Sequence, residues 1–302
     1  MNLEKEDMYQ IDGPLDMTVF FGFCGIKGYN HLRYPEAHPH SPWSMLELKR
    51  TPETNIFDMI REKDLLIHLP YESFDESVVN FLYSAANDKD VLAIKQTLYR
   101  VSSSSPVVQA LEKAVQNGKQ VTVLMEVKAR FDEANNILMA RRLEKAGAHV
   151  IYGLVGLKTH SKCTLVIRRE KDGIRRYVHV ATGNYNASTA KLYTDLGILT
   201  CNDRFGIDAS AFFNLLSGYS DPPIWDSFIV APINLRQRCI ELIDREIHFA
   251  KNGEDAHMIA KMNSLLDKGI IEKLYEASQA GVKIELIVRG ICVLIPGIPG
   301  VS

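Results

Sequence analysis

The sequence predicts an α/β fold built around a central sheet, much of which is parallel. Apolar runs of the length typical of buried strands occur at 91–100, 121–127 and 149–152. Helical stretches lie between them and end at Gly118 and Gly147, and glycine is the residue that most often terminates a helix. Strands that alternate with helices in this way favour a sheet covered by helices.

The other elements follow from the same patterns. A short amphipathic helix begins at Ile56, an apolar strand covers 65–67, and the segment Ser73-Phe74-Asp75-Glu76 starts a helix with an N-cap. Pro106 suits the first turn of the helix that closes at Gly118. Further helices are expected at 134–146 and 209–216, and Asp-Pro-Pro at 221–223 indicates a linker. Beyond it we expect a helix at 235–250, a strand at 257–262, a helix at 270–279 and a strand at 284–289.

Composition limits the possible functions. The 302 residues are 46% hydrophobic and 24% charged, which is enough for a sizeable core in one large or two ordinary domains. The formal net charge of −2 argues against a general nucleic-acid binder, so any polyanion site must be a local concentration of Lys and Arg. Five widely spaced cysteines favour reduced thiols, and neither a signal peptide nor a membrane span is recognisable. We therefore expect a cytoplasmic protein without nucleic-acid partners.

A histidine and a lysine two residues apart form the first candidate site. On a strand, His160 and Lys162 would point to the same face, because strand side chains alternate with period two. A neutral imidazole can attack phosphorus while the ammonium offsets the negative oxygens. The segment Thr182-Gly183-Asn184-Tyr185-Asn186 adds backbone N–H groups and two amides, Asn184 and Asn186, that could hold phosphate oxygens. The alternative is a surface strand with a solvated lysine and an incidental histidine.

Arginines at predicted strand ends could contribute to the same site. Arg100, Arg130 and Arg289 each follow a predicted strand, and ligands of open α/β sheets bind at the carboxyl ends of the strands. Guanidinium groups there could converge with the histidine on an anionic substrate. Alternatively each arginine is solvated or paired, Arg130 with Asp132 or Glu133. Arg168, Arg169, Arg175 and Arg176 flank the turn signal Asp172-Gly173, and we expect them at a solvated hairpin tip.

Two further candidate residues and an internal repeat can be recognised in the sequence. Tyr193 and Asp195 could stack on a base or orient a ring nitrogen, or be an ordinary buried tyrosine and a helix cap. The strand, helix and strand around Lys95, Gly118 and Val123 resemble those around Lys261, Gly281 and Leu286, although a common βαβ rhythm could produce part of this. On this reading the chain holds one complete unit and the start of a second copy. The position that would match His160 falls after Ser302, so we expect a second histidine to be missing.

Several longer strings make the sequence similar to a known family. The segments 94–101, 128–133, 156–162, 182–186 and 192–195 resemble bacterial polyphosphate kinases, whose catalytic half has a phospholipase-D-like fold, and the resemblance spans essentially the whole chain. It implies a phospholipase-D-like mixed sheet flanked by helices. It also implies three parts: the end of a head domain and a connector (1–54), a first catalytic domain (55–222) and the truncated start of a second (223–302).

The resemblance implies residue roles as well. His160 would be phosphorylated by ATP, with Lys162 beside it, and Tyr193 and Arg289 would contact the nucleotide. Arg100 and Arg130 match positions assigned to magnesium in the family, but a guanidinium cannot ligate a cation, so we expect them to hold the phosphates that carry Mg²⁺. The family's second catalytic-domain histidine and its adenine-contacting amino-terminal residues have no counterpart here.

The implied activity is reversible transfer of the ATP γ-phosphate to polyphosphate through a phosphohistidine. ATP or ADP and inorganic polyphosphate would be the partners, Mg²⁺ the cofactor, and the full-length enzyme a homo-oligomer in the cytoplasm or peripheral to the inner membrane. One alternative is a fragment that is inactive or only binds polyphosphate. Another is a phospholipase-D-like phosphodiesterase, but such enzymes usually carry Asp five residues after the lysine, where this chain has Ile167.

Overall fold

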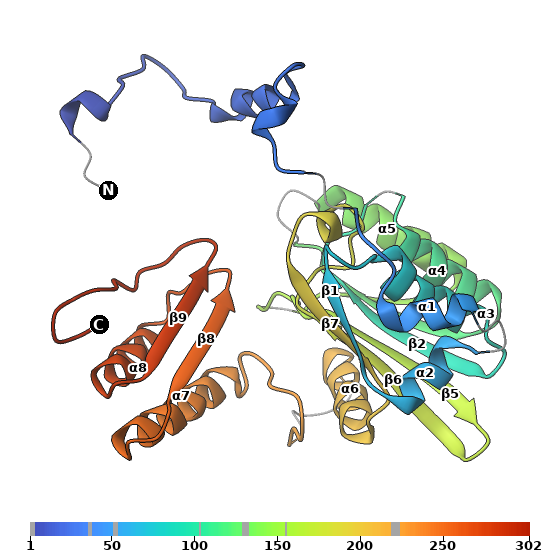
Figure 1. The fold of residues 1–302 in the computed structure, drawn as a ribbon. Helices are drawn as coiled ribbons and strands as arrows, with labels where there is room; N and C mark the ends of the chain where they lie inside the picture. The colour runs from blue at the N-terminus through green and yellow to red at the C-terminus, as the bar shows by residue number, and fades with distance from the viewer. Residues whose placement is uncertain are drawn as a thin grey trace.

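A seven-stranded mixed sheet lies at the centre of residues 54–218, in the order β1-β7-β6-β5-β2-β3-β4 (Figure 1). The computed structural model describes residues 4–35, 38–50, 54–102, 104–128, 133–154, 156–218 and 224–302. The strands are β1 (Leu65–Leu69), β2 (Val91–Leu98), β3 (Gln120–Met125), β4 (His149–Tyr152), β5 (Cys163–Glu170), β6 (Gly173–Ala181) and β7 (Asp195–Thr200). The predicted α/β class with a mixed sheet is confirmed.

Only part of the sheet is parallel. β2 pairs in parallel with β3, and β3 with β4, as expected for strands joined by crossover helices. β5 and β6 instead form a hairpin closed at Asp172-Gly173, and β7 and β1 add to it in antiparallel pairs. The expectation that much of the sheet is parallel was therefore too strong, because the hairpin reverses the chain where no helix intervenes.

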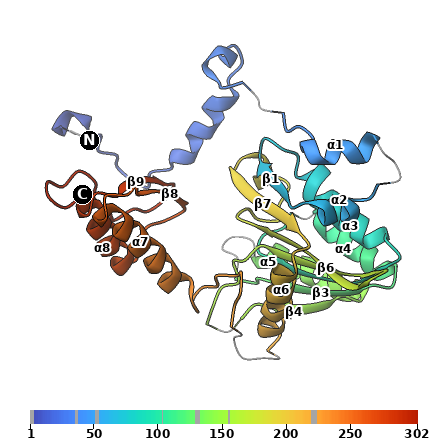
Figure 2. The ribbon, with the colours of Figure 1, turned by 60° about the horizontal axis from the view of Figure 1, so that its bottom comes forward.

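Helices cover both faces of this sheet (Figures 1 and 2). They are α1 (Trp43–Arg50), α2 (Ile56–Glu62), α3 (Asn80–Asn87) with the preceding turn η4 (Asp75–Val79), α4 (Pro106–Gln116), α5 (Glu133–Ala146) and α6 (Asp203–Leu216). Neighbouring strand residues serve opposite faces, since Val166 and Tyr177 pack with the cluster of α2 to α5 while Leu165 and Val178 pack against α6. Each fully buried side chain of this kind contributes roughly 1.5–3 kcal/mol.

A second, smaller unit follows residue 224. It consists of α7 (Leu235–Lys251), β8 (His257–Met262), α8 (Lys268–Gln279) and β9 (Lys283–Val288), with β8 and β9 parallel. Its strand-helix-strand order matches that of β2, α4 and β3. Gly118 and Gly281 both take positive φ angles, 78° and 96°, two residues before the next strand. The predicted elements of this region are confirmed to within two residues.

The amino-terminal stretch contributes nothing to either core. Residues 4–35 contain the short 3₁₀ turns η1 (Lys5–Asp7), η2 (Met17–Gly25) and η3 (Asn30–Leu32), and all of them are exposed. These turns, like α1, were not among the predicted elements.

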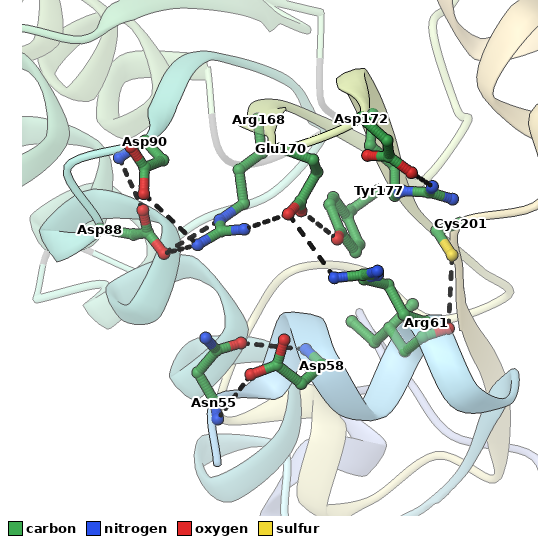
Figure 3. Close-up of polar contacts among 12 residues, drawn as sticks. Asn55, Asp58, Arg61, Asp88, Asp90, Arg168, Glu170, Asp172, Tyr177 and Cys201 are labelled. Carbon is green, nitrogen blue, oxygen red and sulfur yellow. Dashed lines mark hydrogen bonds and ion pairs between the residues drawn. The ribbon is translucent and has the colours of Figure 1, made fainter. Parts of the chain in front are cut away.

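An ionic network ties the far end of the β5–β6 hairpin to the helical layer (Figure 3). Arg168 pairs with Glu170 at 2.7 Å and with Asp88 at 3.0 Å, and its guanidinium lies 5.2 Å from the ring centroid of Phe57. Only 11% of its side chain is exposed, so the expectation of a solvated Arg168 was wrong. Arg168 lies four residues before Asp172, at which the hairpin turns, and there it is within reach of Asp88, in the loop between α3 and β2. Arg175, nearer the tip, pairs locally with Asp172 at 2.7 Å.

Candidate functional site

The strand register brings five chain segments to one edge of the sheet. Leu98 lies beside Met125 at the ends of β2 and β3, while Cys163, which begins β5, lies beside Val180 near the end of β6. β7 begins at the same edge, since Gly197 pairs with Ala181. The segments that meet there are 99–100, 126–128, 159–162, 182–186 and 193–195.

His160 and Lys162 lie in the segment that leads into β5, not on the strand itself. The ladder ends because the Thr97 hydroxyl replaces it: Thr97 Oγ1 donates to the carbonyl of Ser161 at 2.9 Å and accepts the N–H of Cys163 at 3.0 Å. The expectation of a strand was wrong here. The two side chains nevertheless face each other, with Lys162 Nζ 2.9 Å from His160 Nδ1 and 3.2 Å from Nε2. Lys162 also donates to the His160 carbonyl.

The surroundings keep the His160 ring neutral at physiological pH. Partial burial, followed by the charges of Lys162, Arg100 and Lys158, lowers the pKa of His160 below 6.5. Burial also lowers the pKa of Lys162 to about 8, although the carboxylate of Asp195 opposes this shift. Lys162 is 6% exposed, whereas His160 remains open to solvent. The arrangement is an accessible nucleophilic nitrogen beside a largely buried ammonium group.

Three residues that the sequence reading missed hold this pair in place. The ring of Tyr99 meets the His160 ring edge to face, with centroids 4.6 Å apart at 76°. Glu126, 2% exposed, accepts the backbone N–H of Thr159 at 2.7 Å through Oε2 and that of Lys128 at 2.8 Å through Oε1. Asn136 is fully buried and donates to the carbonyls of Tyr99 and Glu126 at 2.7 and 2.8 Å.

A sequence signal for Glu126 was available. Glu126 directly follows an apolar strand, so its carboxylate is expected to be at least partly buried. A buried carboxylate needs hydrogen-bond donors. The donors it finds belong to the segment that carries the histidine.

The loop after β6 packs tightly against the start of β7. A Cβ on Gly183 would lie 2.5 Å from the Asp195 carboxylate, which explains the glycine, and Thr182 Oγ1 donates to Asp195 Oδ1 at 2.8 Å. Asn186 Oδ1 accepts the N–H groups of Ser188 and Thr189, at 3.0 and 3.1 Å, at the start of the turn η5 (Thr189–Lys191). Asn184 is partly buried, and its Oδ1 has no protein partner within the described residues.

The predicted arginines separate into three cases. Arg100 follows β2, lies with its guanidinium 5.6 Å from the Tyr99 ring centroid and is one of the charges that lower the His160 pKa. Arg130 lies outside the described residues. Arg289, from the end of β9, stacks on Tyr193 at 4.8 Å and donates to Asn263 Oδ1.

Tyr193 and Asp195 match neither alternative expected for them, a buried tyrosine and a helix cap. Tyr193 is 43% exposed and is therefore not an ordinary buried tyrosine. Asp195 begins β7 and does not cap a helix. Lys261 of the smaller unit donates to the Thr194 carbonyl at 2.9 Å. Together with Arg289, which stacks on Tyr193, it brings the smaller unit into contact with segment 193–195 of the larger one.

The described residues do not form a binding site for a resident metal ion. No group of three or more His, Cys, Asp or Glu side chains converges anywhere in the described part of the chain. At the sheet edge, both oxygens of Glu126 already accept backbone N–H groups and Asp195 accepts from Thr182, while Lys162 and Arg100 supply positive charge. This donor set fits anionic oxygens better than a bare cation. Among the same residues, no helix is long and apolar enough to cross a membrane.

Comparison with known proteins identifies relatives over the whole chain. The sequence model described as polyphosphate kinase C-terminal domain 1 matches residues 55–222, and that of C-terminal domain 2 matches residues 228–302. A polyphosphate kinase of Halalkalibacterium halodurans is 57% identical over 100% of this chain and 42% of its own length. This chain therefore spans about two fifths of that relative.

One solved structure agrees with the sequence matches. The crystal structure of polyphosphate kinase from Porphyromonas gingivalis matches with a TM-score of 0.79 and 38% identity, over 92% of this chain and 45% of that one. Nuc, a phospholipase D family member from Salmonella typhimurium, matches with a TM-score of 0.39 and 13% identity, over 52% of this chain and 93% of that one.

Proposed function

Because the chain belongs to the polyphosphate kinase family, we propose that it carries the phosphoryl-accepting histidine of a reversible ATP:polyphosphate phosphotransferase. The observation that carries this proposal is the environment of His160. Its imidazole is accessible and lies 2.9 Å from the Lys162 ammonium, and partial burial together with the positive charges around it lowers the pKa of the ring and keeps it neutral.

In the first step a lone pair of the His160 ring attacks the γ-phosphorus of ATP. A P–N bond forms while the bond from phosphorus to the bridging oxygen breaks, and ADP leaves with that electron pair. In the second step the terminal oxygen of polyphosphate attacks the same phosphorus, the P–N bond breaks, and the ring regains its lone pair. Since the phosphohistidine is a high-energy linkage, the sequence of steps runs in both directions.

The surrounding cations lower the barrier by position and charge. Phosphoryl transfer passes through a loose transition state, so neutralisation of the equatorial oxygens contributes most of what the protein supplies. Lys162 lies within 3.2 Å of both ring nitrogens, so a small shift of its side chain moves an N–H donor from the ring to an incoming phosphate oxygen. Arg100 and Lys158 add charge at the same place, and Mg²⁺ enters as part of the nucleotide substrate.

The other predicted residues take supporting roles in this proposal. Tyr193 and Arg289 form an aromatic and cationic surface suited to a nucleotide, and Asn184 offers an amide to phosphate oxygens. Asn186 supports the loop by accepting the N–H groups of Ser188 and Thr189. Residues 55–222 would form one catalytic domain and 223–302 part of a second, in a cytoplasmic homo-oligomer.

Labelling with γ-³²P-ATP tests the histidine directly. The chain, and in parallel a full-length relative, should acquire an acid-labile, base-stable label, and His160→Ala should abolish it. His149→Ala, a change to an exposed histidine on β4, is the matched control and should keep the label. Undiminished labelling of His160→Ala in the full-length protein would rule out this nucleophile.

A further inference from the structure

A chain of four buried polar side chains runs beneath the phosphate-binding loop proposed above. Thr164 Oγ1 lies 2.7 Å from Gln96 Oε1 and 2.8 Å from the Tyr185 hydroxyl, which lies 2.8 Å from His179 Nδ1. All four residues are at most 2% exposed. Tyr185 belongs to the loop itself, so this network connects the interior of the sheet to Asn184, the preceding residue.

Counting protons fixes the state of His179. The Gln96 side chain also hydrogen-bonds the Tyr185 hydroxyl, and that bond carries an amide proton of its own. The other three hydrogen bonds require three protons, and the two hydroxyl groups supply two, because Gln96 Oε1 is only an acceptor. The amide of Gln96 is oriented by its Nε2, which donates to the Thr97 carbonyl. The third proton must therefore come from His179 Nδ1–H. Burial lowers the pKa of His179 to about 4, so the ring is neutral and Nε2 carries a bare lone pair.

The residues that carry this lone pair and a second unpaired acceptor line one pocket. His179 Nε2 and Asn184 Oδ1 are both buried without a protein partner among the described residues. Their residues line the same small pocket, whose other walls include the apolar side chains of Ile67, Leu69 and Phe74. The pocket has room for about one water molecule. Gly197 leaves the space beside Nε2 open, since a Cβ there would lie 2.8 Å from that atom.

We propose that one water molecule occupies this pocket and donates its two protons to His179 Nε2 and Asn184 Oδ1, making His179 a positioning residue for Asn184. An unsatisfied buried acceptor costs about 1–3 kcal/mol, and one water satisfies both acceptors. The two ends of a carboxamide diverge. An Oδ1 held in the pocket therefore directs the NH₂ donor of Asn184 away from it, to the edge where the phosphate oxygens would bind. This role for Asn184 rests on the proposed function.

Two measurements test the water and the tautomer without any turnover. Long-range ¹H–¹⁵N spectra of the ¹⁵N-histidine-labelled chain should show His179 with a protonated Nδ1 and a pyridine-like Nε2, unchanged from pH 8 to pH 5.5. A high-resolution crystal structure should show one water between Nε2 and Asn184 Oδ1, and none in Gly197→Ala. A protonated Nε2, or an anomalous metal signal in the pocket after a Mn²⁺ soak, would overturn the inference and leave the assignment of His160 intact.

A double-mutant cycle tests the positioning role, with tripolyphosphate as the ligand and calorimetry as the readout. Asn184→Ala should weaken binding about tenfold, the size of one hydrogen bond to a charged group. His179→Asn, which keeps a donor toward Tyr185 but lacks Nε2, should weaken it severalfold in the wild-type background and less than twofold in Asn184→Ala. Additive effects would refute the coupling through Asn184. Absence of tripolyphosphate binding to the wild-type chain would refute the phosphate role of the loop. The NMR spectra and the crystal structure would still test the His179 tautomer and the bound water.

Discussion

Replacing Glu126 by glutamine should separate the placement of His160 from the chemistry of its ring. Each carboxylate oxygen accepts one backbone N–H, that of Thr159 at 2.7 Å and that of Lys128 at 2.8 Å. Glutamine has a single acceptor, so one buried N–H would face an NH₂ group. Leaving such a donor unsatisfied costs about 1–3 kcal/mol, and Glu126→Ala, which removes both acceptors, about twice that.

The activity should fall further than the stability. Thr159 directly precedes His160, and a displacement of about 1 Å at a reacting atom can cost on the order of a hundredfold in rate. We therefore expect the rate of phosphohistidine formation from γ-³²P-ATP to fall by ~10- to 100-fold in Glu126→Gln.

The matched control for this experiment is Glu112→Gln. It also removes a carboxylate, one that pairs with Arg142 at 2.6 Å on the outer helices. It should alter the rate less than twofold. A wild-type labelling rate in Glu126→Gln, with its melting temperature lowered, would refute the role assigned to Glu126.

Three other predictions concern the same edge and the opposite one. The labelling rate should decline as pH rises through about 8, because the lowered pKa of Lys162 removes its charge there, and Lys162→Arg should move this decline to higher pH. Gly183→Ala should reduce labelling at least tenfold and destabilise the fold by about 1–3 kcal/mol, because its Cβ would lie 2.5 Å from the Asp195 carboxylate; Gly22→Ala, at an exposed glycine where a Cβ would meet no atom within 4 Å, is the control for a glycine change. Burial alone would raise the pKa of Glu170, but hydrogen bonds from Tyr177 and Arg168 hold it below 4.5, so its contribution to stability is present above that pH and lost as pH falls through the lowered value. Urea unfolding should therefore show a steeper loss of stability below pH 4.5 in the wild type than in Glu170→Gln, and equal slopes would contradict this.

The sequence predicted the elements whose pattern is local. The end of the helix before Gly118 was predicted from a single glycine, and the strand at 257–262 from one apolar run. The strand at 195–200 was missed, since its place in the sheet depends on pairing with β1 and β6, which no local pattern reveals.

In the candidate site, too, residues with a local pattern could be predicted, whereas those that depend on distant partners could not. His160 and Lys162 could be found from their spacing, and the structure does bring them together. The burial of Glu126 could be inferred, but the partners of Glu126 and Asn136 could not be assigned, because apart from the N–H of Lys128 they are backbone groups 10 to 37 residues away. Arg168 was misplaced for a similar reason: its partner Asp88 lies 80 residues earlier in the chain.

The hydroxyl of Thr97 sets a boundary for backbone opening at the edge of the sheet. It binds Ser161 and Cys163 where the ladder between β2 and β5 would otherwise continue. We expect the peptide groups of 160–162 to exchange with deuterium through a local fluctuation, and those of β5 and of Thr159, whose N–H is bound by the buried Glu126, to exchange more slowly. The phosphoryl transfer proposed for His160 would thus take place on a segment that lies outside the strand ladder.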